Sequence, residues 1–406
     1  MLIDYYVFQA VLVATKNLSP LWRNAVRYGY WIPSILAVGA LFWWAFSDPY
    51  RWSHTTRSMI VTGLAAMYLS KIFGVLVMFM DDVQRGFRWI VNLFTKDSAA
   101  IDTTSPAIPR SEFLAKTALV AASVPFGAMI YGVVSGAHDY RVRRVTVNLP
   151  NLPKSFDGIR IGQISDIHSG SFFNKTAVKG GVEMMVNEKP DVIFFTGDLV
   201  NNEATEIHEY FDIFKKLRAP LGVYSVTGNH DYGDYHRWPS AAAKQTNFRN
   251  LMEAHKLMGY NLLMNEHRFL EEGKDKVAII GIENWGARFS KHGKLDRAYS
   301  GSEEAPVKLL LSHDPSHWDA QVKPLYPDID VAFAGHTHGF QFGIEIGNIK
   351  WSPVQYAYKQ WAGLYKDGHQ YLYVNRGFGY LGYPGRVGMP PELTIVELRR
   401  SLIVNS

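Results

Sequence analysis

The sequence predicts an α/β domain that follows a helical membrane region, and two observations predict this fold class. Apolar residues fall in long blocks up to position 137 and in short, strand-sized runs beyond it. From about position 145, short apolar runs alternate with longer amphipathic stretches, a pattern typical of an α/β fold. We therefore expect a membrane region over residues 1–137 and a second domain over residues 141–406.

The composition excludes several classes of protein. The chain has 406 residues, no cysteine, 47% hydrophobic and 19% charged residues, which excludes a disordered or disulfide-stapled chain. The lack of cysteine also excludes thiolate catalysis, iron–sulfur clusters and cysteine-ligated zinc. The net charge of +5 is small for this length and the basic residues are scattered, so we expect no nucleic-acid partner.

Three segments are long and apolar enough to span a bilayer as helices. Residues 28–47 contain no charge and residues 115–137 contain one, Lys116, near their start. Both are close to the roughly 20 residues that a spanning helix needs. Residues 58–80 are almost as apolar but carry Lys71 near their middle. Residues 1–15 are interrupted by Asp4 and either span the membrane or lie on its surface, so we expect three to four spans.

Two features of this region leave alternatives open. A charge within a span marks a candidate functional site, but we favour a Lys71 that faces the helix bundle or extends toward the interface. A transport function is the other interpretation, although three or four spans are few for a transport path. Residues 83–94 predict either an interfacial amphipathic helix or a loop helix packed on the bundle.

Positive residues indicate the orientation of the chain, because they favour the cytoplasmic side of a membrane. One loop region carries Lys16, Arg23 and Arg27. Three crossings from there also leave Arg85, Arg88, Lys96 and Arg110 in the cytoplasm, whereas Arg51, Arg57 and Arg141 oppose this orientation. We expect an integral protein of a bacterial inner membrane with its C-terminal domain outside the cytoplasm.

Polar residues follow five predicted strands of the second domain, at residues 159–165, 192–196, 223–227, 307–312 and 331–334. The carboxyl ends of strands are where α/β sheets place their chemistry. In chain order the polar blocks are Asp166-Ile167-His168, Gly197-Asp198, Gly228-Asn229-His230-Asp231, Ser312-His313-Asp314 and Gly335-His336-Thr337-His338.

The residue types in these blocks predict a metal site. Carboxylate, imidazole and amide oxygen are ligands of divalent cations, and two cations about 3.5–4 Å apart need a bridging carboxylate. In an extended segment, residues two apart point the same way, so Asp166 with His168, and His336 with His338, would each enter one pocket. A single such triplet occurs by chance, but five ordered blocks do not. Other histidines, among them His255 and His267, lie in polar or loop contexts and receive no role.

The ordered blocks closely resemble the calcineurin-like metallophosphoesterase superfamily, whose signature is D-x-H, G-D, G-N-H-[DE], H and G-H-x-H. No block is missing, and residues 375–379, Arg386 and Pro391-Glu392 look like its membrane-associated YkuE-type branch. In that branch a second glycine often follows G-H-T-H-G, but Phe340 stands there in this chain. The resemblance covers about residues 141–398 and implies a calcineurin-like four-layer αββα sandwich for the catalytic domain, residues 141–406.

The resemblance also implies the roles of the site residues. It implies two divalent metal ions, which these ligands accept as Mn, Fe, Zn or Co. One ion would be held by Asp166, His168 and His338, the other by Asn229, His313 and His336, and Asp198 would bridge them. His230 would be a catalytic acid, or a donor to the phosphoryl oxygens, near the leaving group, with an acidic partner. His317 either supports the site or caps a loop.

These roles imply a membrane-anchored, dinuclear metal-dependent phosphoesterase. It would hydrolyse a phosphodiester or phosphomonoester by in-line attack of a metal-bridging hydroxide. Some relatives cleave a UDP-2,3-diacylglucosamine-type lipid precursor at its pyrophosphate, which is the first alternative, although that precursor is cytoplasmic. An inactive membrane-anchored binding or sensing module is the alternative from another class.

An aromatic segment follows the last predicted ligand: Trp351, Tyr356, Tyr358, Trp361 and Tyr365. These residues either line a groove for a lipid or nucleotide, anchor the domain against the bilayer, or pack as an ordinary β-rich core. The expected partners are therefore the bilayer and a phosphate-ester substrate. If the aromatic residues line a lipid groove, this substrate is linked to a lipid. The sequence does not indicate the oligomeric state.

Overall fold

The computed structural model describes residues 1–47, 52, 54–95, 111–347 and 349–401. The chain divides into two compact units, unit 1 (Met1–Tyr131) and unit 2 (Gly132–Ser406), and each is described by itself. Arg51, Lys96 and Arg110, which entered the orientation argument, lie outside the described residues.

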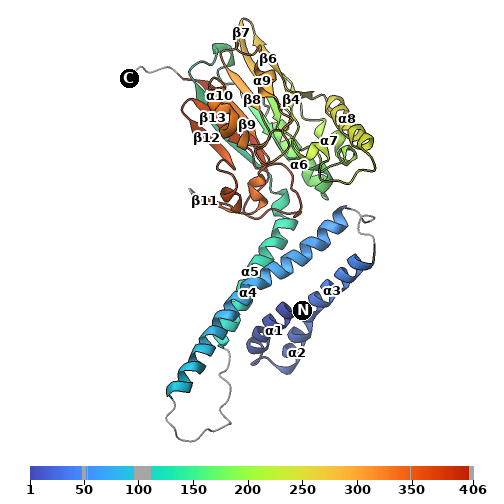
Figure 1. The fold of residues 1–406 in the computed structure, drawn as a ribbon, viewed down its shortest axis with the longest axis vertical. Coiled ribbons are helices and arrows are strands. Elements are labelled where there is room, and N and C mark those ends of the chain that lie inside the picture. The colour runs from blue at the N-terminus through green and yellow to red at the C-terminus, as the bar shows by residue number, and fades with distance from the viewer. Residues whose placement is uncertain (48–51, 53, 96–110, 348, 402–406) are drawn as a thin grey trace. The chain divides into compact units, whose positions relative to one another are not determined.

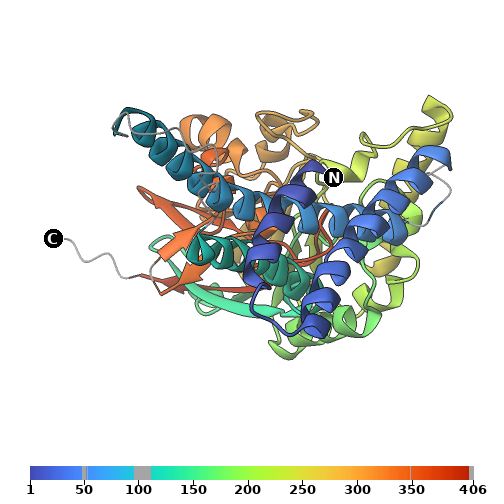
Figure 2. The same ribbon diagram turned by 90° about the horizontal axis from the view of Figure 1, so that it is seen from below.

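Unit 1 is helical (Figures 1 and 2). Its helices are α1 (Leu2–Ala14), α2 (Pro20–Gly29), α3 (Trp31–Phe46), α4 (His54–Thr95) and α5 (Glu112–Val134), the last of which continues into unit 2. Three helical stretches of the described chain are long and apolar enough to cross a membrane: Pro20–Phe46, Thr55–Phe94 and Glu112–His138. They cover the three predicted spans, so the predicted N-terminal helical region is confirmed. Helix α1 has 13 residues and is shorter than a span.

Helix α4 runs without a break through residues 83–94, so the separate helix predicted there is wrong. Its 42 residues contain no proline, and a single glycine such as Gly86 lowers helix stability without ending a helix. Asp82 and Arg85, three residues apart, form an ion pair of 3.0 Å that supports the helix at this point.

Lys71 faces the interior of unit 1. Its Nζ lies 2.5 Å from Oδ1 of Asp4, a fully buried carboxylate that also accepts a hydrogen bond of 2.7 Å from Ser34. A buried charge is tolerated when it is paired and hydrogen-bonded. The two charges that interrupt predicted apolar segments therefore neutralise one another.

Unit 2 contains two six-stranded sheets. The first has the order β1 (Arg141–Leu149), β14 (Glu392–Arg400), β2 (Arg160–Ile164), β3 (Val192–Phe195), β4 (Val223–Ser225) and β5 (Asn261–Leu262). Only β14 and β2 pair antiparallel among the described strands of this sheet.

The second sheet has the order β12 (Gly363–Asp367), β13 (Gln370–Val374), β9 (Val331–Ala334), β8 (Lys308–Leu311), β7 (Asp275–Gly281) and β6 (Glu266–Glu272). Its two edge strands, β12 and β6, pair antiparallel with their neighbours, and the central strands are parallel. A separate antiparallel hairpin consists of β10 (Ile344–Ile346) and β11 (Ile349–Trp351).

Buried apolar side chains form three clusters, one between the two sheets and one on the outer face of each sheet. The ribbon shows the sheets and the helices that cover them (Figures 1 and 2). Strand β3 shows the alternation that produces the clusters: Phe194 packs between the sheets, whereas Ile193 packs under the helices that cover the first sheet. Those helices are α6 (Lys175–Asn187), α7 (Phe211–Phe214) and α8 (Ala241–Met258). The short helices α9 (Leu295–Tyr299) and α10 (Lys323–Leu325) lie beside the second sheet. The four-layer αββα sandwich is confirmed.

His255 lies in this core, contrary to the expected polar or loop context. It sits on the buried face of α8, where Nδ1 lies 3.0 Å from the hydroxyl of Ser225. Burial lowers its pKa to about 3. The helical period places positions 251, 254, 255 and 258 on one side, which turns a polar residue into a core residue.

We expect unit 2 to lose stability below pH 6.5 because of His255. The unfolded side chain takes up a proton near pH 6.5 and the folded one only near pH 3, so stability falls as the pH falls between these values. At pH 5 the loss from this residue is about 2 kcal/mol. Unfolding of the full chain in detergent, followed at pH 7.5 and at pH 5, should show a smaller pH effect for His255→Gln. An equal pH effect in both proteins would contradict this prediction.

Candidate metal centre

The predicted site residues lie at one edge of unit 2, where strands of both sheets end. Asp166 and His168 follow β2, Asp198 follows β3, Asn229 and His230 follow β4, His313 follows β8, and His336 and His338 follow β9. Hydrogen bonds and close contacts, given below, join residues from all five strand ends. The structure therefore brings together residues that are up to 172 positions apart, from Asp166 to His338.

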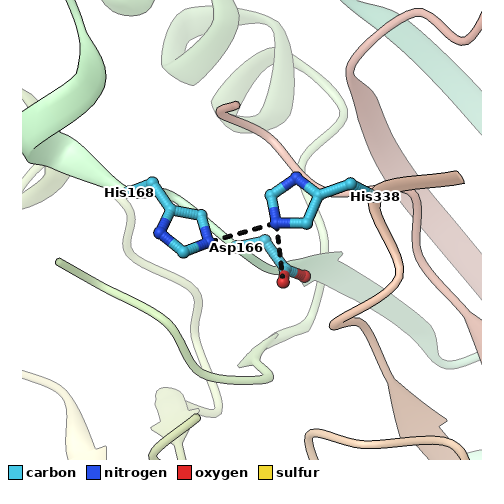
Figure 3. A group of neighbouring side chains, drawn as sticks. All are labelled: Asp166, His168 and His338. Atoms are coloured by element: carbon cyan, nitrogen blue, oxygen red, sulfur yellow. Dashed lines mark hydrogen bonds and ion pairs between the residues drawn. The ribbon is translucent and has the colours of Figure 1, made fainter. Parts of the chain in front are cut away.

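Asp166, His168 and His338 form the first cluster (Figure 3). Nε2 of His168 lies 3.1 Å from Nε2 of His338, which in turn lies 3.2 Å from Oδ1 of Asp166. All three side chains are buried. Two imidazole nitrogens and a carboxylate oxygen that converge in a buried position form the donor set of a divalent cation.

Asp198, His313 and His336 form the second cluster. Nδ1 of His336 lies 3.3 Å from Nε2 of His313, which lies 3.2 Å from Oδ2 of Asp198. The same oxygen of Asp198 is 3.4 Å from Nε2 of His168 in the first cluster. Asp198 thus contacts both clusters with one oxygen, as a bridging ligand must.

Asn229 offers a further oxygen. Its Nδ2 donates a hydrogen bond of 2.9 Å to the hydroxyl of Tyr235, which fixes the orientation of the amide. Its Oδ1 is buried and accepts no hydrogen bond from the residues that the structure describes. A buried acceptor without a partner costs free energy unless a cation or water satisfies it. This oxygen therefore fits a metal ligand.

Three hydrogen bonds orient the imidazole rings. Nδ1 of His168 donates to Oδ1 of Asn201 (3.1 Å), and Nδ1 of His313 donates to the carbonyl oxygen of Thr196 (2.7 Å). Each Nδ1 therefore carries the proton and each Nε2 presents its lone pair to the centre. The hydroxyl of Tyr358 lies 2.8 Å from Nε2 of His336, which leaves Nδ1 of that ring facing His313.

The sequence did not predict these supporting residues. Asn201 lies three positions after Asp198, but a lone asparagine in a loop carries no signal. Tyr358 belongs to the predicted aromatic segment, and only the fold selects it from its neighbours. In the same segment Trp361 is buried, whereas Trp351 and Tyr356 are exposed, so the segment does not have one role.

The backbone at the ligands is left-handed, which corrects the expectation of extended segments. Asp166, His168, Asp198, His336 and His338 have φ angles between 49° and 69°. Residues other than glycine rarely adopt these angles, and strained backbone gathers at functional sites. The paired side chains converge because of these tight turns and not because of strand alternation.

Two glycines allow the close approach of the ligand loops. A Cβ atom at Gly335 would lie 2.2 Å from Oδ2 of Asp166, and one at Gly228 would lie 2.2 Å from Oδ1 of Asp198. Both distances are far below van der Waals contact. Any side chain at either position would displace a predicted ligand.

The buried carboxylates of the cluster stay ionised, and the imidazolium of His313 offsets only part of their charge. Burial opposes ionisation of Asp198, but His313 and His230 hold the pKa of this carboxyl well below its usual range. Burial also disfavours a charged His313, yet the carboxylates of Asp198 and Asp166 raise the pKa of its imidazole to about 10. Burial keeps the pKa of His168 well below 6.5. Carboxylates in a buried site attract cations, and a metal ion competes with the His313 proton.

Asp231 holds two ligand loops together. It lies in the 3₁₀ turn His230–Tyr232 and accepts hydrogen bonds from the backbone N–H of Asp198 (2.9 Å), Leu199 (2.8 Å) and Gly228 (2.9 Å). Burial, together with the charge of Asp198, raises the pKa of Asp231 to about 7. It is a positioning residue for the loops after β3 and β4.

The prediction of an acidic partner for His230 is wrong. Nδ1 of His230 donates to the carbonyl oxygen of Asn201 at 2.9 Å. The backbone N–H of His230 donates to Oδ1 of Asp198 at 2.8 Å, so the residue is fixed beside the bridging carboxylate. His317 bonds to Ser312 (2.9 Å) and to Gln321 (3.0 Å), and burial lowers its pKa to about 4, which favours the structural alternative.

Arg386 ties the loop after β13 to the loop after β9. Its buried guanidinium donates to the carbonyl oxygens of Gly379 (2.9 Å), Arg376 (2.8 Å) and His338 (3.3 Å). Phe340, two residues beyond His338, has a φ of 60° and an exposed ring. Glycine adopts this conformation without strain, whereas a phenylalanine does not.

Two family profiles match the chain. The profile of the calcineurin-like phosphoesterases matches residues 159–340, and a profile described as probable calcineurin-like phosphoesterase, transmembrane domain, matches residues 1–137. The relative YkuE of Bacillus subtilis, a metallophosphoesterase by name, is 29% identical over 289 residues, which are 68% of this chain and 94% of YkuE.

Two animal relatives are named transmembrane protein with metallophosphoesterase domain. The Danio rerio protein is 30% identical over 284 residues, which are 67% of this chain and 60% of that protein. The Bos taurus protein is 28% identical over 303 residues, which are 72% of this chain and 65% of that protein. The matched part thus spans less than two thirds of either animal relative.

Proposed function

Because the chain belongs to the membrane-associated metallophosphoesterases of the calcineurin-like family, we propose that it is a membrane-anchored phosphoesterase with a dinuclear metal centre. It hydrolyses a phosphodiester or phosphomonoester by in-line attack of a water-derived hydroxide on phosphorus. The observation that carries this proposal is the position of Asp198, whose Oδ2 lies within 3.4 Å of a histidine from each cluster.

The ligand sets follow from the two clusters. Asp166, His168 and His338 hold one cation, Asn229, His313 and His336 hold the other, and Asp198 bridges them. Bound divalent cations supply a hydroxide at neutral pH and neutralise the charge that develops on the phosphoryl oxygens. Imidazole, carboxylate and amide ligands accept Mn, Fe, Zn or Co.

The protein's own groups orient the reaction. Asn201 and Thr196 hold the rings of His168 and His313 so that their lone pairs face the centre. His230 acts as the imidazolium: its Nδ1–H is used by the carbonyl of Asn201, and its Nε2–H faces the substrate and gives its proton to the leaving oxygen, which leaves a neutral imidazole. The intact ligand set argues against an inactive sensing module.

We further propose that unit 2 works outside the cytoplasm of a bacterial inner membrane. Lys16, Arg23 and Arg27 gather near the start of the first long apolar stretch, and such residues favour the cytoplasmic side. Three crossings from there support an extracytoplasmic unit 2.

Removal of metal tests the proposed function. The full chain in detergent, stripped with EDTA, should lose hydrolysis of bis-p-nitrophenyl phosphate and regain it when Mn²⁺, Fe²⁺, Zn²⁺ or Co²⁺ is added singly. Elemental analysis of the reactivated protein should find two ions per chain. Turnover that survives EDTA, or full activity with one ion, would refute the dinuclear proposal. Two bound ions without turnover of any phosphate ester would favour the sensing module.

A further inference from the structure

The β10–β11 hairpin has its charged face inward and its apolar face outward. The cross-strand pairs Ile344–Trp351 and Ile346–Ile349 alternate with the pair Glu345–Lys350. Opposite residues of a hairpin share a face, and successive residues alternate between faces. The four apolar side chains are 41–71% exposed, whereas Glu345 and Lys350 are half-buried. A hairpin that faces water shows the reverse pattern.

The inward orientation of the charged pair is fixed by unit 2. Glu345 accepts hydrogen bonds from Arg143 (3.0 Å) and from Arg376 (3.2 Å), and Arg376 is buried. Lys350 donates to the carbonyl oxygen of Ala362, and its Nζ lies 4.3 Å from the centre of the Trp361 ring. A slip of one residue would break these contacts, so the apolar residues cannot turn inward.

Exposed aromatic residues flank the hairpin in sequence. Phe340 is 55% exposed and Tyr356 is 79% exposed. The backbone of Phe340 is in the left-handed conformation that suits glycine. The chain therefore has a strained backbone and a solvent-exposed apolar ring at the same residue. We call Phe340, Ile344, Ile346, Ile349, Trp351 and Tyr356 the apolar surface.

Within unit 2 the hairpin is linked to the end of the third candidate membrane span, Glu112–His138. The carbonyl oxygen of Gly132, near the end of this span, accepts a hydrogen bond of 3.1 Å from the backbone N–H of Arg386. The next residue, Val387, accepts a hydrogen bond of 2.9 Å from Gly343, directly before β10. Figure 1 shows β11 at the end of unit 2 where its chain begins.

We propose that the apolar surface inserts into the interfacial layer of the membrane that carries this chain. The end of a spanning helix lies at the bilayer surface, and two hydrogen-bonded steps separate it from β10. Isoleucine side chains favour the acyl region, and tryptophan and tyrosine favour the headgroup boundary. Because unit 1 already holds the chain in the membrane, even weak insertion is intramolecular and therefore effective.

This inference goes beyond the proposed function and does not depend on it. Taken together with that function, it assigns a substrate class. His338 stands two residues before Phe340, so insertion holds a predicted metal ligand close to the headgroup layer. The substrate would then be a phosphate ester at the membrane surface.

Site-directed spin labelling tests the insertion, and the absence of cysteine allows one label per chain. Full-length Ile346→Cys or Ile349→Cys, labelled and reconstituted in phosphatidylethanolamine–phosphatidylglycerol vesicles, should be more accessible to oxygen than to a water-soluble nickel complex. The matched control is Lys274→Cys, an exposed position in the turn of the β6–β7 hairpin, which Figure 1 shows at the opposite end of unit 2. Its label should show the reverse preference.

Two results would overturn the proposal. If the labels at 346 and 349 and the control label prefer the nickel complex equally, the surface lies in water. If the labels broaden one another, and the broadening disappears when unlabelled chain is added in excess, a second copy covers the surface. Neither readout requires catalysis, so a failure here is distinguishable from a failure of the proposed function.

Discussion

Asp198→Asn should abolish hydrolysis and lower the metal content of the protein. The two carboxylate oxygens have different tasks, because Oδ1 accepts the backbone N–H of His230 at 2.8 Å and Oδ2 lies between His168 and His313. An asparagine must place its NH₂ group at one of these two positions. At the position of Oδ1 the NH₂ group would face the backbone N–H of His230, which is also a donor. At the position of Oδ2 it would face the ring nitrogens of His168 and His313 and the proposed cations.

The loss should therefore be larger than the loss of one negative charge alone. A bridging carboxylate contributes to both metal sites, so its removal weakens both, and the amide cannot compensate in either orientation. Hydrolysis of bis-p-nitrophenyl phosphate should fall to the rate of the uncatalysed reaction. Elemental analysis should find fewer than two ions per chain.

Asp212→Asn is the matched control, because Asp212 is an exposed carboxylate of the same unit. It makes the same chemical change and should leave both metal content and turnover unchanged. An Asp198→Asn protein that keeps two ions and turns over at the original rate would exclude the bridging role. Thermal unfolding of both variants separates a loss of metal from a loss of fold.

The order of the ligand blocks was predictable from the sequence because each block follows an apolar strand. Parallel strands of one sheet place their carboxyl ends at the same edge, so the blocks after β2, β3 and β4 were expected together, as were those after β8 and β9. That Asp166 meets His338 depends on how the two sheets pack on one another. Only the resemblance to the calcineurin-like superfamily implied four layers, whereas the strands and the amphipathic helices between them predicted an α/β fold. These signals are local and repeat along the chain.

The parts that escaped prediction depend on contacts between distant residues. The partner of His230 is a backbone carbonyl, and because every residue has one, no residue type in the sequence predicts this partner. The left-handed turns at Asp166 and His336 arise from packing between ligand loops that the glycines permit. Glu345 and Lys350 belong to a pattern that predicts a solvated polar face, and only their contacts with distant residues, such as that of Glu345 with the buried Arg376, hold this face inward. Helix α4 continued because its residues lack a strong stop signal.

His230→Ala should keep both metal ions and lose rate by roughly 10²- to 10⁴-fold, the usual contribution of a general acid. The side chain is not part of either cluster. Its Nδ1–H is used by the carbonyl oxygen of Asn201, and its main-chain contact to Asp198 does not depend on the side chain. The substitution therefore removes a proton donor while the metal ligands keep their positions.

The dependence on the leaving group identifies the role of His230. A p-nitrophenolate leaves readily without a proton, whereas an alkoxide does not, so the variant should lose more rate on an alkyl phosphodiester than on bis-p-nitrophenyl phosphate. His236→Ala, at an exposed histidine of the same loop, should change neither rate. An equal loss on both substrates would favour a donor to the phosphoryl oxygens over an acid for the leaving group. Loss of a metal ion in His230→Ala would instead make His230 a ligand and would refute the assignment of the two metal sites.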